Sequence, residues 1–182
     1  MTPRLCLILG GVRSGKSSFA EKLVKDVDGP VLYVATGIPI DREMEERIRR
    51  HRDSRPAHWN TLEEPLNLTA GIEAELASAA NSGAVLVDSL DVWLANFLLE
   101  RQTETASAVE ASAMCAFEGL LSLACRTPVP FFLVSSEVGL SLVPPEPLGR
   151  RFQNLLGLLN QRVAAAADQV YLVVAGIPKR IK

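Results

Sequence analysis

The chain has 182 residues, of which 48% are hydrophobic, and it carries 19 Lys and Arg against 21 Asp and Glu. This length and composition predict one domain spanning residues 1–182. The formal net charge of -2 provides no overall field that would attract nucleic acid or an anionic membrane, so function has to be sought in a local site.

The cysteines and the apolar runs indicate the cellular compartment in which the protein is expected. Cys6, Cys115 and Cys125 have no paired or metal-binding spacing, so we expect reduced, mostly buried thiols. The apolar stretch at the N-terminus is short and leads directly into a glycine loop, unlike a signal peptide. We find no apolar run near the ~18 residues that cross a bilayer. These features predict a cytoplasmic protein with no integral membrane segment and no nucleic-acid partner.

Short aliphatic runs alternate along the chain with segments of helical periodicity. Strands are expected at 5–9, 31–35, 84–87, 131–135 and 170–174. Helices are expected at about 15–26, 41–53, 66–80, 91–124 and 146–167, and the long fourth segment is expected to hold more than one helix or a projecting arm. Continuous apolar strands alternating with helices predict an α/β fold, with a mostly parallel central sheet covered by helices on both faces.

The first expected strand leads into Gly10-Gly11-Val12-Arg13-Ser14-Gly15-Lys16-Ser17, which fits G-x-x-x-x-G-K-[ST] at every fixed position. Glycines let successive backbone N–H groups turn toward phosphate oxygens, and the following helix adds its positive dipole end. Lys16 would reach the β- and γ-phosphates, and Ser17 would bind Mg²⁺. A tight strand-to-helix connection is the alternative interpretation. We favour nucleotide binding, and therefore a P-loop NTPase fold.

Asp88 follows the expected strand 84–87, at the position where P-loop proteins place a carboxylate beside the metal ion. The other interpretation is that Asp88 only ends the strand or caps the next helix, which is a common role for Asp. Because the chain also has a P-loop, we favour Asp88 as a metal-side carboxylate.

Residues 41–59 concentrate basic side chains around His51. Five arginines fall within nine residues: Arg47, Arg49, Arg50, Arg52 and Arg55. Such a cluster could hold a triphosphate. It could equally form a solvated helix face whose arginines pair with Glu43, Glu45 and Glu46.

His51 follows Met44 and Ile48 at helical spacing, which places it on the apolar stripe of this expected helix. An inward histidine is either a packed core residue or a catalytic group. The helix follows the second strand, whose carboxyl end should flank the P-loop crevice, and ligands of open α/β sheets bind there. Both roles remain open from the residues alone.

Several segments together resemble the bifunctional adenosylcobinamide kinase/adenosylcobinamide-phosphate guanylyltransferase family of cobalamin assembly. The resemblance extends over nearly the whole chain. Its most specific parts are the arginine-rich helix ending in H-x-x-x-R-P-x-x-W and the late N-Q-x-x-A-x-x-A-D segment. The matching segments are GGVRSGKS, YVATG, DREMEERIRRHRDSRPAHW, TLEEP, VDSLDVWLANFL, SSEVGLSLVP and GLLNQRVAAAADQVYLVVAG.

The resemblance implies a two-step enzyme. It would phosphorylate adenosylcobinamide with a nucleoside triphosphate, ATP or GTP, and would then transfer GMP from GTP to that phosphate through a covalent GMP-histidine. The histidine between the arginines and the R-P pair is His51, and His58 ranks second. Mg²⁺ is the implied cofactor, held by Ser17 and Asp88, with Lys16 as the catalytic P-loop lysine.

The resemblance also implies a nucleotide-binding set, a recombinase-like branch of the P-loop fold and a homo-oligomer, in this family a trimer. The implied nucleotide contacts are Gly10, Gly11, Val12, Arg13, Ser14, Gly15, Lys16, Ser17, Thr36, Gly37, Ile38, Arg52, Asp53, Ser54, Arg55, Glu63 and Asp88.

Two positions differ from the family pattern. Ser136 stands where Asn often precedes Glu137, and Ser89 stands where Cys often follows the metal-side carboxylate, so the role of Glu137 stays open. Two other functions remain as alternatives: a single-function P-loop kinase for another small metabolite, and a nucleotide-switch or assembly ATPase. A covalent guanylyl adduct would exclude the first, and corrinoid-dependent nucleotide consumption would exclude the second.

Overall fold

The computed structural model describes residues 2–39, 42–53, 55–78 and 82–182, without the side chains at 43, 44, 47, 50, 51 and 53. The strands are β1 (Leu5–Gly10), β2 (Val31–Ala35), β3 (Asn60–Glu63), β4 (Ala84–Asp88), β5 (Phe131–Ser136), β6 (Gln169–Val174) and β7 (Ile177–Arg180). The helices are α1 (Lys16–Lys25), α2 (Arg42–Asp53), α3 (Leu68–Ser78), α4 (Leu90–Glu100), α5 (Ala106–Arg126) and α6 (Pro147–Ala166).

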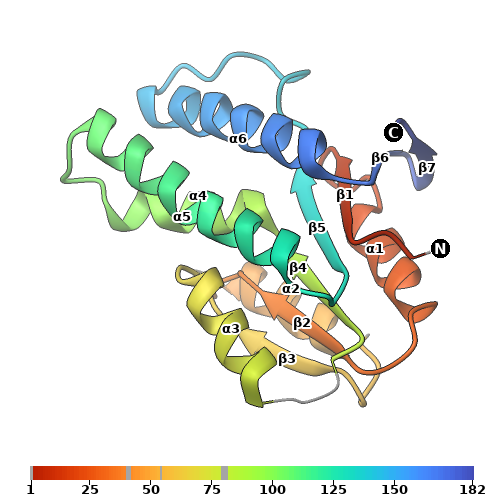
Figure 1. The fold of residues 1–182 in the computed structure, drawn as a ribbon. Helices are drawn as coiled ribbons and strands as arrows, with labels where there is room; N and C mark the ends of the chain where they lie inside the picture. Colours follow the sequence, from red (N-terminus) through yellow and green to blue (C-terminus); the bar gives the residue numbers. More distant parts are fainter. Residues whose placement is uncertain (1, 40–41, 54, 79–81) are drawn as a thin grey trace.

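The described strands form one sheet in the order β3-β2-β4-β5-β1-β6-β7 (Figure 1). All neighbouring pairs are parallel except β6 and β7. The predicted α/β fold with a mostly parallel sheet is therefore confirmed. The central strands β1 and β5 are buried along their whole length, as expected for strands covered on both faces.

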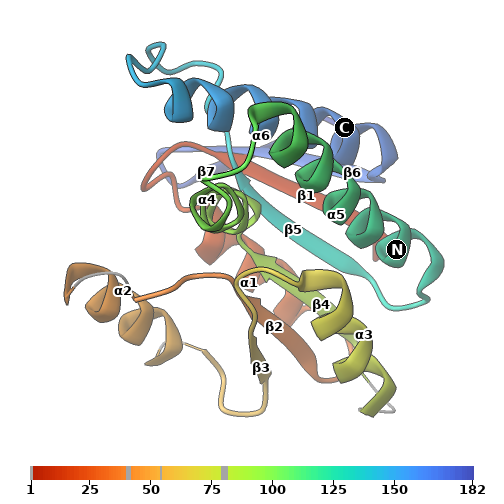
Figure 2. The same ribbon diagram turned by 90° about the vertical axis from the view of Figure 1, so that its left-hand side faces the viewer.

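Alternate residues of the central strands enter two separate cores. Leu5, Leu7 and Leu9 of β1 join a large cluster with side chains from α3, α4, α5 and α6. Cys6 and Ile8 face the other side, where α1 and Trp59 cover the sheet. Figure 2 shows α2 standing away from these layers, beyond the end of β2. The prediction of helices on both faces is thus confirmed, with most of them on one face.

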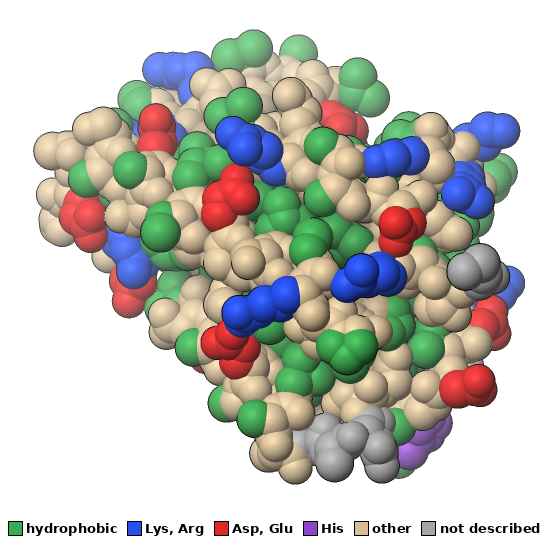
Figure 3. Space-filling model, viewed as in Figure 1, with side chains coloured by type: hydrophobic (Ala, Val, Ile, Leu, Met, Phe, Trp, Pro, Cys, Tyr) green, Lys and Arg blue, Asp and Glu red, His purple; other side chains and the backbone are tan. Residues whose placement is uncertain are grey.

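The helical layer over the larger core contains a long apolar helix. By length and composition α5 is the one described helix that could cross a membrane. Its residues Val109, Phe117 and Leu120 are instead buried in the core against the sheet and its helical neighbours. Figure 3 shows basic and acidic side chains interspersed on this face of the molecule. These contacts are those of a core helix.

One prediction for a connecting segment is confirmed, and two strands of the sheet are additional to the predicted ones. The segment 91–124 forms two helices, as the length of the connection suggested, because the polar run 101–105 ends α4 and Thr105 caps α5 by accepting a hydrogen bond from the Ala108 N–H. The strands β3 and β7 were not predicted. Both lie at sheet edges and are largely exposed, so they have no continuous apolar run.

The prediction of mostly buried thiols is wrong for two of the three cysteines. Cys6 lies in β1 and is fully buried, whereas Cys115 and Cys125 are exposed on α5. The helix is long enough for its outer face to extend beyond the core, so apolar residues on that face remain in contact with solvent. Burial raises the pKa of the Cys6 thiol to about 12. Cys6 therefore stays protonated at neutral pH, and the thiolate is the reactive form.

We expect a thiol reagent at pH 8 to modify Cys115 and Cys125 in the native protein and to spare Cys6. Denaturant should expose Cys6 and return its pKa toward the ordinary value, so the third modification should then appear. Intact-mass measurement with peptide mapping distinguishes the three sites. Native labelling of Cys6 as fast as that of Cys115 would contradict the buried position of β1.

Candidate functional site

The carboxyl ends of the parallel strands meet at one edge of the sheet. Ala35 at the end of β2 pairs in register with Asp88 of β4 on one side and with Glu63 of β3 on the other. Gly10, which ends β1, pairs with Ser136 at the end of β5. Residues far apart in the sequence therefore meet at the edge where open α/β sheets bind their ligands.

The loop between β1 and α1 has the geometry of a tight glycine-rich turn. Gly15 has φ of 92° and directly precedes the first residue of α1, a conformation in which glycine has no steric penalty. The Ser14 N–H donates to the Gly11 carbonyl, and the Ser14 carbonyl accepts from the Gly176 N–H of the β6–β7 turn. The helix N-terminus and its unpaired N–H groups thus lie at the site.

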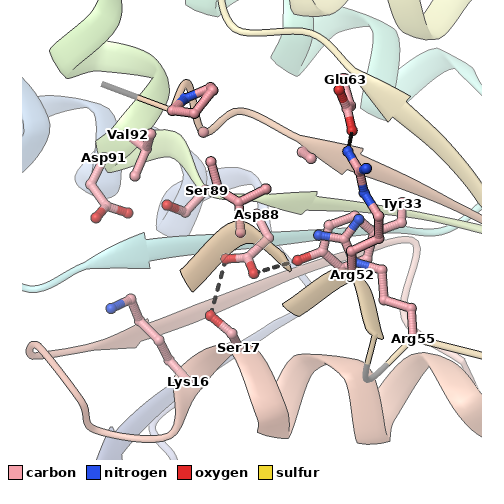
Figure 4. A pocket seen from close by; sticks show the side chains of 14 residues that line it. Lys16, Ser17, Tyr33, Arg52, Arg55, Glu63, Asp88, Ser89, Asp91 and Val92 are labelled. Atoms are coloured by element: carbon pink, nitrogen blue, oxygen red, sulfur yellow. Dashed lines mark hydrogen bonds and ion pairs between the residues drawn. The ribbon is translucent and has the colours of Figure 1, made fainter. Parts of the chain in front are cut away.

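Asp88 connects the loop to the second strand. Its Oδ1 accepts a hydrogen bond from the Ser17 hydroxyl at 3.1 Å, and its Oδ2 accepts one from the Tyr33 hydroxyl at 2.6 Å (Figure 4). The residue that caps α4 is Ser89, so Asp88 ends its strand but does not cap the helix. Two hard oxygen donors, a serine hydroxyl and a carboxylate, therefore lie together.

The arginine segment contributes to the same site. Arg52 from the end of α2 forms an ion pair with Glu63, and both side chains are more than half exposed. The Arg55 guanidinium lies over the Tyr33 ring, 3.6 Å from its centroid. Arg49 is exposed. Arg52 and Arg55 therefore lie at the site and Arg49 lies in solvent, while the side chains of Arg47 and Arg50 are outside the described residues.

These side chains line one cavity (Figure 4). Of the residues expected to form the site, it contains Lys16, Ser17, Gly37, Arg52, Arg55, Glu63 and Asp88. Lys16 donates to the Gly11 carbonyl at 3.3 Å, folded back on its own loop. The cavity thus joins residues from the loop, from three strand ends and from the arginine segment.

The structure places other expected residues outside the cavity lining. Thr36 is fully buried, and its hydroxyl bonds to the Ser89 backbone. Ile38 and the loop residues 10–15 do not line it either. The Glu137 carboxylate accepts from the Gly139 N–H at 2.6 Å and is also outside the lining.

The structure describes the two histidines to different extents. The backbone of His51 lies in α2, between Ile48 and Arg52, both of which line the cavity. The side chains of His51, Met44 and Asp53 and the whole of Ser54 lie outside the described residues. His58 is exposed and does not line the cavity.

Sequence reasoning missed several lining residues, chiefly Tyr33 and Asp91. Tyr33 lies in the apolar run of β2, and only its hydroxyl marks it as polar. Burial raises the pKa of the Tyr33 phenol far above its usual value, so it remains a hydrogen-bond donor. Asp91 accepts from the Ser136 hydroxyl at 2.7 Å, while its Oδ1 is buried without a partner among the described residues. The signal for Asp91 that the sequence offered was a second carboxylate three positions after Asp88.

A glycine loop between a central strand and a helix, with a lysine, a hydroxyl and a carboxylate from a neighbouring strand, is consistent with a P-loop NTPase. Comparison with known proteins makes this class more specific. The family described as cobinamide kinase / cobinamide phosphate guanyltransferase matches residues 6–181, and the chain belongs to this family. Family membership indicates both a kinase and a guanylyltransferase activity.

The chain aligns with curated relatives over nearly the whole length of both sequences. The chain is 40% identical to the bifunctional adenosylcobalamin biosynthesis protein CobU of Salmonella typhimurium, covering 98% of this chain and 99% of the relative. It is 42% identical to the bifunctional adenosylcobalamin biosynthesis protein CobP of Pseudomonas aeruginosa, covering 97% and 96%. The Escherichia coli CobU protein is 36% identical, with 98% and 99% covered.

The two glycines that begin the loop should tolerate substitution very differently. A Cβ on Gly10 would lie 2.7 Å from the Val173 carbonyl oxygen and in closer conflict with the Ser14 hydroxyl, whereas a Cβ on Gly11 would meet nothing within 4 Å. We expect Gly10→Ala to lower the free energy of unfolding by ~1–3 kcal/mol. The matched control Gly11→Ala should stay close to the parent in urea unfolding. Equal stability of the two variants would show that the loop does not pack on β6 as described.

Proposed function

We propose that this chain phosphorylates the aminopropanol hydroxyl of adenosylcobinamide with a nucleoside triphosphate and then transfers GMP from GTP to the resulting phosphate. The observation that carries the proposal is the shared cavity, which joins Lys16, Ser17 and Asp88 to Arg52 and Arg55. The names of the relatives, bifunctional proteins of adenosylcobalamin biosynthesis, support the choice of substrate. ATP, GTP and adenosylcobinamide are the proposed small-molecule partners.

The kinase step is a direct displacement. The substrate hydroxyl oxygen would attack the γ-phosphorus, its proton would leave, and the nucleoside diphosphate would depart. Lys16 would leave the Gly11 carbonyl and turn to the β- and γ-phosphates. Gly10, Gly11, Val12, Arg13, Ser14 and Gly15 would surround the phosphates with backbone N–H groups.

The guanylyl step needs a nucleophile, and we assign it to His51. Its imidazole nitrogen would attack the α-phosphorus of GTP, forming a phosphorus–nitrogen bond as pyrophosphate leaves. The phosphate oxygen of the corrinoid would then attack the same phosphorus and release the histidine. Arg52 and Arg55 line the cavity and would stabilise the negative charge. Thr36, Gly37, Ile38, Asp53, Ser54 and Glu63 complete the proposed nucleotide set.

Mg²⁺ is the proposed cofactor, and the residues present fit it. The Ser17 hydroxyl and the Asp88 carboxylate are hard oxygen donors only 3.1 Å apart. Within the described residues no group of three His, Cys, Asp or Glu forms a metal site. This suits Mg²⁺, which is usually held by one or two carboxylates together with substrate phosphates and water. When bound, the ion would neutralise phosphate charge.

The finer features implied by the family resemblance are proposals of the same kind. We place both reactions in one domain, in the recombinase-like branch of the P-loop fold, and in the cytoplasm. We also propose a homotrimer. Large exposed apolar side chains support an association surface, in particular Leu140, Leu142 and Val143, which follow β5.

Lys16→Ala should lower kinase turnover by ~10²-fold or more, the scale measured when one positioned electrostatic group is removed. The reason is that the phosphoryl group carries charge that Lys16 would neutralise during transfer. Turnover is measured with adenosylcobinamide and ATP on protein with an unchanged melting temperature. Lys22→Ala on the same helix is the control and should leave turnover at the parental level. Near-normal turnover of folded Lys16→Ala would refute the assignment.

His51→Ala should separate the two activities, because only GMP transfer requires the nucleophile. We expect no GMP adduct by intact-protein mass after incubation with GTP and Mg²⁺, while phosphorylation of adenosylcobinamide remains measurable. His58→Ala is the matched control and should keep the adduct. If His51 were a packing residue, its loss would lower the melting temperature and reduce both activities together. A full-stoichiometry adduct on His51→Ala removes this residue from the mechanism.

A further inference from the structure

Tyr33 contacts both the metal-side carboxylate, Asp88, and the arginine segment, through Arg55. It is 1% exposed, and its hydroxyl donates to Asp88 Oδ2 at 2.6 Å while Ser17 holds Oδ1. Both oxygens of this carboxylate therefore have fixed partners, and Figure 4 shows Tyr33 and Ser17 approaching Asp88 from different elements. The hydroxyl of Tyr33 thus determines how the carboxylate is turned.

The ring of Tyr33 supports the arginine segment. The Arg55 guanidinium lies 3.6 Å from the ring centroid, and the Trp59 ring stacks on Tyr33 with centroids 6.2 Å apart at 26°. Trp59 is 7% exposed and belongs to the core on the α1 side of the sheet. A cation over the face of an aromatic ring is attracted by the negative potential of that face. This contact holds the chain that follows α2 against the sheet.

We propose that Tyr33 is a positioning residue for the nucleotide: its hydroxyl orients Asp88 toward the bound metal ion, and its ring places Arg55 in the phosphate cavity. This inference rests on the proposed function and deepens it, because it assigns the arrangement of the nucleotide site to a residue that acts through Asp88 and Arg55. The two contacts use different parts of one side chain. They can therefore be removed separately.

Tyr33→Phe deletes the hydroxyl and keeps the ring. The quantity measured is the Mg²⁺ concentration at which binding of the β,γ-imido analogue of GTP is half-maximal. We expect it to rise about tenfold, because that is the scale of losing one hydrogen bond to a charged group. Binding of the same analogue in EDTA should stay at the parental level, since Arg55 keeps its support. Isothermal titration calorimetry at a series of Mg²⁺ concentrations measures both quantities.

Tyr33→Leu removes the ring as well, and it should weaken binding of the analogue in EDTA too. Tyr171→Phe is the matched control, because Tyr171 packs on Phe19 of the same core and its hydroxyl donates to Gln169 at 3.2 Å. It should leave the Mg²⁺ dependence unchanged. Melting temperatures of all variants separate these effects from loss of packing.

Parental Mg²⁺ dependence in Tyr33→Phe would overturn the proposal, and so would an equal loss of binding with and without Mg²⁺. The second result is what a purely structural role predicts. Since the measurement uses only the GTP analogue, it is independent of the corrinoid reaction. If the parent protein neither phosphorylated the corrinoid nor formed the GMP adduct, the proposed function would be refuted. The assignment of Tyr33 would still stand.

Discussion

The parallel register of β2 with its neighbours is the constraint on which the site depends. Ala35 is level with Asp88 on one side and with Glu63 on the other, so both carboxylates reach the same edge of the sheet. Parallel strands can be connected only by crossovers, which return every strand in the same direction. The ends of β1, β2 and β4 therefore meet, and Ser17 can bond to Asp88 across 71 positions of sequence.

Contacts at this edge of the sheet differ in how strongly they fix the positions of the side chains. The ion pair between Arg52 and Glu63 joins two side chains that are each more than half exposed, and water screens such pairs strongly. The hydrogen bond from Tyr33 to Asp88 is short and lies next to the core, where few water molecules compete. The buried contact is thus the stronger determinant of the geometry, and the exposed ion pair contributes less to it.

In the proposed function one cavity serves both transfers, since each reaction binds a nucleoside triphosphate and the two differ in which phosphorus is attacked. Groups that neutralise phosphate charge are useful in either reaction. The nucleophile is needed in only one of them. In the proposed function, the helix α2 supplies that nucleophile beside the P-loop. Burial, together with the neighbouring Asp88, raises the pKa of the Glu21 carboxyl.

The sequence by itself determined the local features. The fixed spacing of GGVRSGKS specified the loop, since glycines and a lysine at those positions have one common use, and the apolar runs specified five strands of the sheet. The family followed from segments distributed along the whole chain. These signals are local because each depends on residues within one loop, one strand or one helix.

Only the tertiary structure decided which side chains meet. Tyr33 looked like one more core residue of β2, and its role appears only because β4 places Asp88 beside its hydroxyl and the segment after α2 places Arg55 on its ring. Thr36, which is expected at the nucleotide, is fully buried, and its hydroxyl bonds to the Ser89 backbone. Such contacts arise from strand order and register across the sheet, which sequence periodicity does not specify.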